Sequence, residues 1–209
     1  MAFTRFKYIL SNKKETYYGN ITTNKKKTDI EKLKNYFLER GEYRNYALVT
    51  FGLNTALRIS DILKIKWGDV YDSNTHSFLT HIHLIEQKTQ KETYILVNKS
   101  VKKALIQYKN TLDAIRPEEY IFSSQKNRSL PISRVQAFRI IKEAVDALNL
   151  GEHISCHSLR KTFGYQAWKE GAEPALLMNI FNHSSFEITK RYLCIDQDDK
   201  DKLFYRINL

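Results

Sequence analysis

The stretch that most constrains this chain lies near its carboxyl end, in residues 155–192. Its pattern predicts a helix that Gly171 ends and a second helix that Pro174 begins. A polar turn, residues 182–185, and a short third helix follow. The stretch therefore predicts short helices in succession, joined by tight turns.

Four polar side chains in this stretch suit one chemistry. His157 and Arg160 are three residues apart on the first predicted helix, so they share a face and can reach one small target. His183 follows in the turn, and Tyr192 follows on the last helix. A phenol can attack, imidazoles can move protons, and a guanidinium can hold an anion. Each residue alone also fits an ordinary structural role, so the hypothesis depends on the whole set.

The charge balance indicates what the anion is. Lysine and arginine number 34 against 23 acidic residues, which gives a net charge of +11 and a pI near 9.5. Such a positive field attracts nucleic acid first and anionic membranes second, and the alternative is a basic surface that only keeps the protein soluble. The sequence shows no apolar run of about eighteen residues and no signal peptide. We therefore expect a cytoplasmic protein that binds nucleic acid and has no membrane partner.

The cysteine content fits the same compartment. Cys156 and Cys194 are the two cysteines of the chain, with no CxxC pair, which argues against a disulfide framework and fits a reducing cytoplasm. The alternative is a zinc site formed by these cysteines with His157 and His183. Their spacing matches no usual zinc-ligand pattern, so we favour packing roles for both cysteines.

The length of 209 residues and an apolar content of 42% fit one domain with a substantial core. Residues 1–28 are basic and polar, and we expect an arm that is extended, folds as a short hairpin or is partly disordered. The capping box Thr28-x-x-Glu31 predicts the start of the first helix. Between Lys66 and Val97 the pattern changes to strands and a hairpin. The expected fold class is therefore mainly α with a small antiparallel β-sheet (α+β).

A second pair of polar residues lies on a third predicted helix, which begins at Thr55 or Leu57. Arg58 and Asp61 could form only an exposed ion pair along this helix. The apolar neighbours of Arg58 instead predict a partly buried guanidinium that Asp61 orients. Lys88 lies at or near the tip of the predicted hairpin, where a lysine is usually a solvated turn residue. It matters only if the hairpin points to the same place as Arg58.

Together these motifs resemble the catalytic domain of the tyrosine recombinase, or phage integrase, family. The resemblance covers about residues 29–200, and the order and approximate spacing of six positions match. The matching segments are Thr55-Ala56-Leu57-Arg58-Ile59-Ser60-Asp61, the hairpin Lys88, His157-x-Leu-Arg160, His183-Ser-Ser and Tyr192.

The resemblance implies that Tyr192 attacks a scissile DNA phosphate, forms a 3′-phosphotyrosyl bond and releases a 5′-hydroxyl. Arg58 and Arg160 would grip the non-bridging oxygens, because the planar guanidinium matches phosphate bidentately. Asp61 would hold Arg58 in place. The covalent bond conserves the phosphodiester energy, so the reaction is expected to need no ATP, no metal and no other cofactor.

The proton transfers would fall on three other residues. Lys88 would protonate the leaving 5′-oxygen. His157 would help to remove the proton of Tyr192, since a phenol with an ordinary pKa of about 10 is a poor nucleophile at neutral pH. His183 would donate a hydrogen bond that stabilises the charge of the transition state.

The chain also departs from the family pattern. Asn182 stands where members often have glycine, but asparagine tolerates left-handed backbone geometry, so the turn is expected to survive. Ala56 replaces another common glycine, which we expect to be a mild change within a helix. Many members carry a separate N-terminal helical domain that closes around DNA. We expect a compact member here, with the arm in 1–28, a catalytic domain in 29–209 and a docking tail in about 196–209.

The implied partner is double-stranded DNA that carries specific recombination sites. We expect a monomer when the protein is free and a homo-oligomer, a tetramer, on DNA. An accessory DNA-bending protein is a further expected partner. The expected origin is a prokaryotic cell, a phage or a mobile element. Arg134, Lys161 and Arg191 are expected phosphate contacts. The alternatives are a DNA-binding regulator of this fold that does not recombine DNA, and a type IB topoisomerase-like enzyme that relaxes supercoils.

Overall fold

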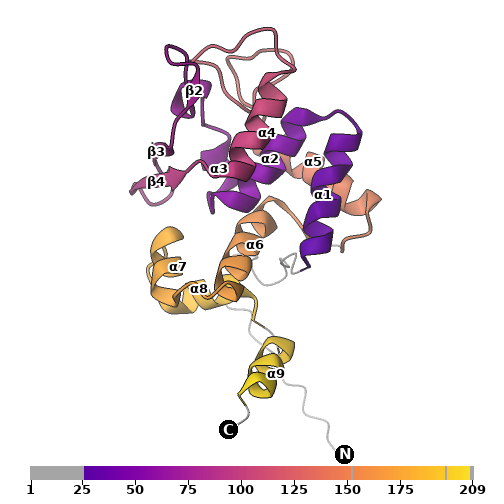
Figure 1. Ribbon diagram of the computed structural model, residues 1–209, viewed down its shortest axis with the longest axis vertical. Coiled ribbons are helices and arrows are strands. Elements are labelled where there is room, and N and C mark those ends of the chain that lie inside the picture. The colour runs from indigo at the N-terminus through magenta and orange to yellow at the C-terminus, as the bar shows by residue number, and fades with distance from the viewer. Residues whose placement is uncertain (1–25, 152, 196, 208–209) are drawn as a thin grey trace, which may run out of the picture.

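The computed structural model describes residues 26–207 except residues 152 and 196, so most of the expected arm, residues 1–25, lies outside the described residues. The described chain is mainly helical with short antiparallel strands, which confirms the expected fold class (Figure 1). Within it, the helices are too short or too polar to span a membrane. The elements are α1 (Lys27–Glu39), α2 (Tyr43–Asn54), α3 (Ile59–Ile62), the 3-10 helix η1 (Trp67–Asp69), β1 (Tyr71–Asp72), β2 (Ser77–Phe78), β3 (His81–Ile85), β4 (Glu92–Leu96), α4 (Lys99–Lys109), α5 (Arg134–Ala147), α6 (Cys156–Lys169), α7 (Pro174–Ile180), α8 (Phe186–Leu193) and α9 (Gln197–Arg206).

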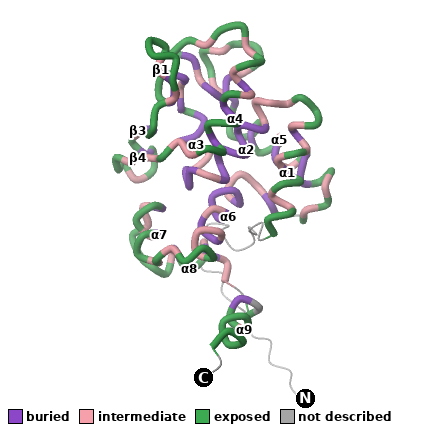
Figure 2. Tube along the Cα trace, viewed as in Figure 1, coloured by how far each residue is buried: buried purple, intermediate pink, exposed green. Residues whose placement is uncertain are grey.

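Helix α2 lies at the centre of the larger hydrophobic core. Residues Tyr46 to Leu53 are all buried, because α1, α4 and α6 pack around this helix (Figure 2). Such a helix has to be apolar on all sides. Phe51 packs edge to face against Phe122, with ring centroids 5.8 Å apart. The same core includes Leu159 of α6, so it fixes the helix that carries the HxxR pair.

A second, smaller core joins α6 to α7 and α8. Leu177, Phe181 and Leu193 are buried there. Gly164 of α6 permits the close approach, because a Cβ at this position would lie 2.7 Å from the Phe181 ring. The succession of helices expected from the sequence is therefore present, and residues 155–192 contribute side chains to both cores.

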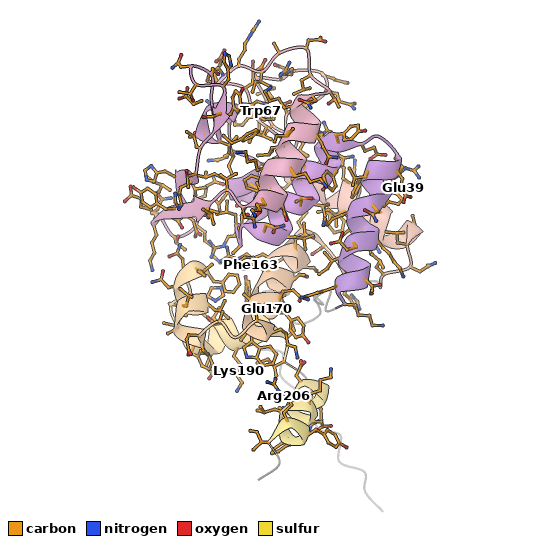
Figure 3. The ribbon with its side chains drawn as sticks, viewed as in Figure 1. Glu39, Trp67, Phe163, Glu170, Lys190 and Arg206 are labelled. Carbon is orange, nitrogen blue, oxygen red and sulfur yellow. The ribbon has the colours of Figure 1, made fainter. Side chains whose placement is uncertain are left out.

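Helix α9 lies apart from these cores, at the lower end of the molecule in Figure 3, where Arg206 is far from Trp67 of the upper core. It is tied to α6 by the Tyr165 hydroxyl, which donates to the Asp199 carboxylate at 2.8 Å. The expected tail at about 196–209 is thus helical over most of its described length.

The strands of the described chain form two antiparallel ribbons rather than one sheet. β1 pairs with β2, and β3 pairs with β4 with His81 opposite Leu96 and Ile85 opposite Glu92. A break at residues 79–80 separates β2 from β3. The second ribbon carries the turn in which Lys88 lies.

Two helix starts differ from the expected positions. Helix α1 begins one residue before Thr28 and has no side-chain cap, so the predicted capping box is wrong. Helix α3 begins only at Ile59, because Ala56 has a left-handed φ of 55° and Arg58 is extended. The expectation that Ala56 is a mild replacement within a helix is therefore also wrong. Alanine has a Cβ that makes this backbone region unfavourable, which glycine avoids.

Candidate active site

One cleft gathers the predicted catalytic residues from several parts of the fold. It encloses about 440 Å³ between the start of α3, the turn after β3, the starts of α5 and α6, and α8. The ring of His183 lies beside the cleft, with its centroid 4.4 Å from that of Tyr192. The structure thus brings all six residues together. The charged, imidazole and phenol side chains that line the cleft are Arg58, Lys88, Arg134, His157, Arg160 and Tyr192.

Arg160 is the most enclosed of these cations, with 1% of its surface exposed. Its terminal nitrogens donate to the backbone carbonyls of Ala56 and Phe181, the second at 2.7 Å. Its Nε is buried and has no hydrogen-bond partner among the described residues. Burial first, and then the nearby charge of Arg58, lower the pKa of Arg160 to about 10, so it stays protonated at neutral pH. A charged guanidinium with an unused buried N–H is a donor for an anion.

Arg58 is held by a carboxylate that the sequence analysis missed. Its Nη1 lies 2.5 Å from Oε2 of Glu86, whose side chain is 1% exposed. The Thr89 hydroxyl donates to the same oxygen at 2.8 Å. Asp61, expected to hold Arg58, instead accepts a hydrogen bond from the backbone N–H of Gln87 at 3.0 Å, and burial raises the pKa of Asp61. Glu86 is therefore the direct partner of Arg58, and Asp61 fixes the start of the hairpin turn.

We expect Glu86→Gln to lower the free energy of unfolding by about 1–3 kcal/mol, because the half-buried Arg58 guanidinium loses its anionic partner. DNA cleavage should slow as well, since Arg58 is no longer held toward the cleft. Urea titration followed by circular dichroism measures the first effect. Glu92→Gln is the matched control, because Glu92 lies on the same ribbon and its side chain is 59% exposed. Equal stability of the two variants would contradict the assignment.

Tyr192 lies between the two histidines. Its ring centroid is 5.0 Å from that of His157 and 4.4 Å from that of His183, and both contacts are edge to face. Nδ1 of His183 forms a hydrogen bond with the Thr189 hydroxyl at 3.0 Å. Nε2 of His183 is buried without a hydrogen-bond partner in the described part of the chain, so it is free to bond a ligand. Two imidazoles beside a phenol are suited to proton transfer.

Both histidines are neutral at pH 7. Burial first, and then the charges of Lys161 and Arg160, lower the pKa of His157 to about 4. Burial and then the charge of Arg160 lower the pKa of His183 to about 4. A neutral imidazole can accept a proton, whereas a permanently protonated one cannot.

The free energy of unfolding should rise with pH between about 4 and 6.5. The unfolded histidines titrate near 6.5 and the folded ones near 4, so the unfolded state binds more protons in this window and is favoured as the pH falls. We expect His157→Gln to flatten part of this dependence. The exposed His81 on β3 provides the control His81→Gln, which should leave the slope unchanged. Urea titrations at several pH values test this, and equal slopes for both variants would contradict it.

Lys88 lies on the same cleft as Arg58, as its expected role requires. It lies in the exposed turn between β3 and β4. The turn is held by the backbone N–H of Gln90, which donates to the carbonyl of Glu86 at 2.8 Å, and Gln90 has a left-handed φ of 55°. A lysine on such a turn keeps its charge in contact with solvent and with any anion in the cleft.

The turn before His183 has the geometry expected for it. Asn182 adopts a left-handed φ of 50°, the conformation that asparagine tolerates better than most residues. The chain therefore leaves α7 sharply and places His183 next to α8. This agrees with the interpretation that asparagine preserves the turn.

The three predicted DNA contacts have different surroundings. Arg134 is exposed and lines the cleft, and Arg191 is exposed on α8. Lys161 is only 5% exposed, and its Nζ lies 5.9 Å from the centre of the Tyr192 ring. Lys161 is thus enclosed beside Tyr192, and its expected phosphate contact stays a prediction.

The alternative zinc site is not formed. Cys156 and Cys194 are free cysteines, and burial raises the pKa of the Cys156 thiol to about 12, which disfavours the thiolate that zinc binds. Among residues 26–207, outside the two gaps, no group of three or more His, Cys, Asp or Glu side chains is placed to hold a metal ion. The expectation of no metal and no cofactor stays a prediction.

The sequence matches one known family over most of its length. Residues 23–198 match the sequence model of the Phage integrase family. This chain belongs to that family. A relative in Bacillus subtilis (strain 168), named "Probable integrase/recombinase YoeC", is 42% identical over 169 residues, which are 81% of this chain and 87% of the relative. A protein named "Tyrosine recombinase" in Agathobacter rectalis is 28% identical over 161 residues, 76% of this chain and 50% of that protein. This phage integrase family member thus spans most of one relative and half of the other.

Solved structures share the fold of this family member. The crystal structure of XerA recombinase has a TM-score of 0.73 at 18% identity, covering 90% of this chain and 64% of that one. A post-cleavage complex of the XerH site-specific recombinase with a palindromic difH substrate has a TM-score of 0.69 at 16% identity, covering 89% of this chain and 53% of that one. At these identities the likeness concerns the fold alone.

Proposed function

We propose that this chain carries the catalytic domain of a site-specific DNA recombinase that cleaves and rejoins strands through a 3′-phosphotyrosyl intermediate. One observation carries the proposal. The phenol of Tyr192 lies between the neutral imidazoles of His157 and His183, in a cleft that also contains the guanidiniums of Arg58 and Arg160. Membership of the phage integrase family supports the same reaction class.

The scissile phosphate would bind where unused donors meet. The buried Nε of Arg160 and the buried Nε2 of His183 both lack hydrogen-bond partners among the described residues. Arg58 adds a second guanidinium, which Glu86 holds in place. Buried donors that are already oriented stabilise the negative charge of a phosphoryl transition state without reorganising.

Cleavage then requires two proton transfers. The Tyr192 oxygen attacks phosphorus while its proton passes to His157, and the bond from phosphorus to the 5′-oxygen breaks. Lys88, in the exposed turn, gives its proton to the departing 5′-oxygen. Rejoining runs through the same steps in reverse, so the phosphodiester energy is retained in the protein–DNA bond.

Residues 29–209 would form the catalytic domain of an assembly on DNA. The end of helix α9 and the residue after it support this, because their apolar side chains are exposed. Leu203, Phe204, Tyr205 and Ile207 are between 54% and 88% exposed. We propose that this tail docks on a neighbouring protomer in a tetramer on DNA, while the free chain is a monomer. The protein would act in the cytoplasm or nucleoid of a prokaryotic cell, with or without a DNA-bending protein.

The tail proposal predicts weaker cooperative assembly when Phe204 and Tyr205 are both changed to serine. These side chains are exposed, so the fold of the free chain should keep its stability. A gel-shift titration on a two-site duplex measures the cooperativity. Lys202→Ser is the control on the same helix. Unchanged synapsis in the double variant would count against docking by α9.

Covalent trapping tests the function itself. The protein is incubated with a nicked suicide duplex that carries candidate sites from its own genomic flanks, and the products are separated on a denaturing gel. A protein–DNA band that survives denaturation is the expected result. Dependence on two specific sites favours recombinase over topoisomerase. Ordinary gel-shift binding without a covalent band would contradict the proposal and favour the regulator.

A further inference from the structure

Lys161 occupies an unusual place for a lysine. It lies on α6 one turn after His157, and only 5% of its surface is exposed. Its Nζ lies 5.9 Å from the centre of the Tyr192 ring. Lysine is rarely buried to this extent, because desolvating an ammonium is unfavourable unless something compensates. The buried charge therefore lies next to the two groups that would exchange the reacting proton.

We infer that Lys161 is a positioning residue whose enclosed charge acts on His157 and stabilises the phenolate that forms on the adjacent Tyr192. The inference rests on the proposed function, since it assigns a role within the same cleft. It is an alternative to the expected phosphate contact of Lys161, which stays a prediction. Lys161 would touch neither the phosphate nor the leaving oxygen and would act through its neighbours.

The groups around His157 show why Lys161 is the cation that affects this imidazole most. Positive groups dominate, and the carboxylate of Glu86 is already paired with Arg58. Of the charged neighbours that lower the pKa of His157, Lys161 has the largest effect, after burial. The charged and titratable groups that face His157 are Arg160 and Lys161 on α6, Arg58 before α3, Lys88 in the hairpin turn, His183 after α7 and Tyr192 on α8.

This arrangement couples substrate binding to proton transfer. Without DNA, burial first and then the cations of the cleft disfavour a proton on His157. A bound phosphate brings negative charge that offsets these cations, so the basicity of His157 rises when the scissile group is in place. The proton of Tyr192 is then accepted while the phosphate is bound, and the phenolate forms beside the ammonium of Lys161. Solvent screens the charge of an exposed lysine such as Lys88 more than that of the enclosed Lys161, so Lys161 has the larger effect on His157.

The test is an NMR titration of the histidine side chains in the full-length free protein, labelled with ¹⁵N histidine. The His157 signal is assigned from its loss in His157→Gln. In Lys161→Met we expect the His157 midpoint to move up by about one pH unit, and in Lys161→Arg we expect it to stay low. Lys190→Met is the control, because Lys190 is exposed on α8. An unchanged midpoint in Lys161→Met would overturn the inference.

Two further measurements keep the test decisive. If Lys161→Met does not fold, Lys161→Gln retains a polar side chain of similar length and carries the same expectation. In the trapping assay, Lys161→Met should slow covalent complex formation at pH 7 about tenfold with unchanged DNA affinity. The NMR result does not depend on cleavage, so an inactive wild-type protein would refute the proposed function and leave the His157 measurement valid. A shifted midpoint with an unchanged cleavage rate would refute the role of Lys161 in the reaction.

Discussion

Tyr192→Phe should abolish the covalent protein–DNA band while DNA affinity in a gel-shift assay stays within about twofold of wild type. The variant lacks only the oxygen that would attack phosphorus, so strand cleavage should fall by at least about 10⁴-fold. The phenylalanine ring can keep the edge-to-face contacts with His157 and His183. The fold is therefore expected to survive, and the loss can be attributed to chemistry.

A matched control separates this effect from the general loss of a hydroxyl. Tyr36 lies on α1, outside the cleft, and packs edge to face on Phe37 with centroids 5.2 Å apart. Tyr36→Phe should give as much covalent complex as wild type. A Tyr192→Phe protein that still forms a denaturation-resistant band would show that another residue is the nucleophile, and peptide mapping of that band would identify it.

Arg160→Lys has the second largest expected effect, although it preserves the charge. One ammonium cannot replace a guanidinium that donates to the carbonyls of Ala56 and Phe181 and still presents Nε to a ligand. Cleavage should fall by about 10²- to 10³-fold, the cost of losing one oriented donor in a transition state. At least one buried carbonyl also loses its partner, so the free energy of unfolding should fall by about 1–3 kcal/mol.

Trapping rates and urea titration measure the two effects together. Arg139→Lys is the control, because Arg139 is exposed on α5 and does not line the cleft. A cleavage rate within about tenfold of wild type in Arg160→Lys would mean that the guanidinium geometry is not used. A loss of stability with unchanged cleavage would mean that Arg160 stabilises the contact between the two cores and takes no part in the reaction.

Local patterns in the sequence were sufficient to identify most of the site. The helix that carries His157 and Arg160, the glycine that ends it and the turn at Asn182 depend on neighbours along the chain. Hydrophobic spacing, helix ends and left-handed backbone preferences are properties of a few consecutive residues. The six candidate catalytic positions could be named for this reason, since the prediction used their order and spacing along the chain.

The expectations that failed include the backbone conformation at Ala56 and the residue that holds Arg58. Ala56 adopts a left-handed conformation, and its carbonyl accepts a hydrogen bond from Arg160, which is 104 positions away in sequence. Glu86 pairs with Arg58 across 28 positions, and the sequence marked it only as an acidic residue at the end of an apolar strand. The nearer residue Asp61 was the natural choice without a structure.

The sequence by itself determined the family, the fold class and the set of residues that meet in the cleft. Only the tertiary structure decided which carboxylate holds Arg58, which donors remain unused and on which side of α6 Lys161 is enclosed. The physical reason is that burial and ion pairing depend on every element that packs around a side chain. A basic residue on a helix has the same local signal whether solvent or the Tyr192 ring lies beside it.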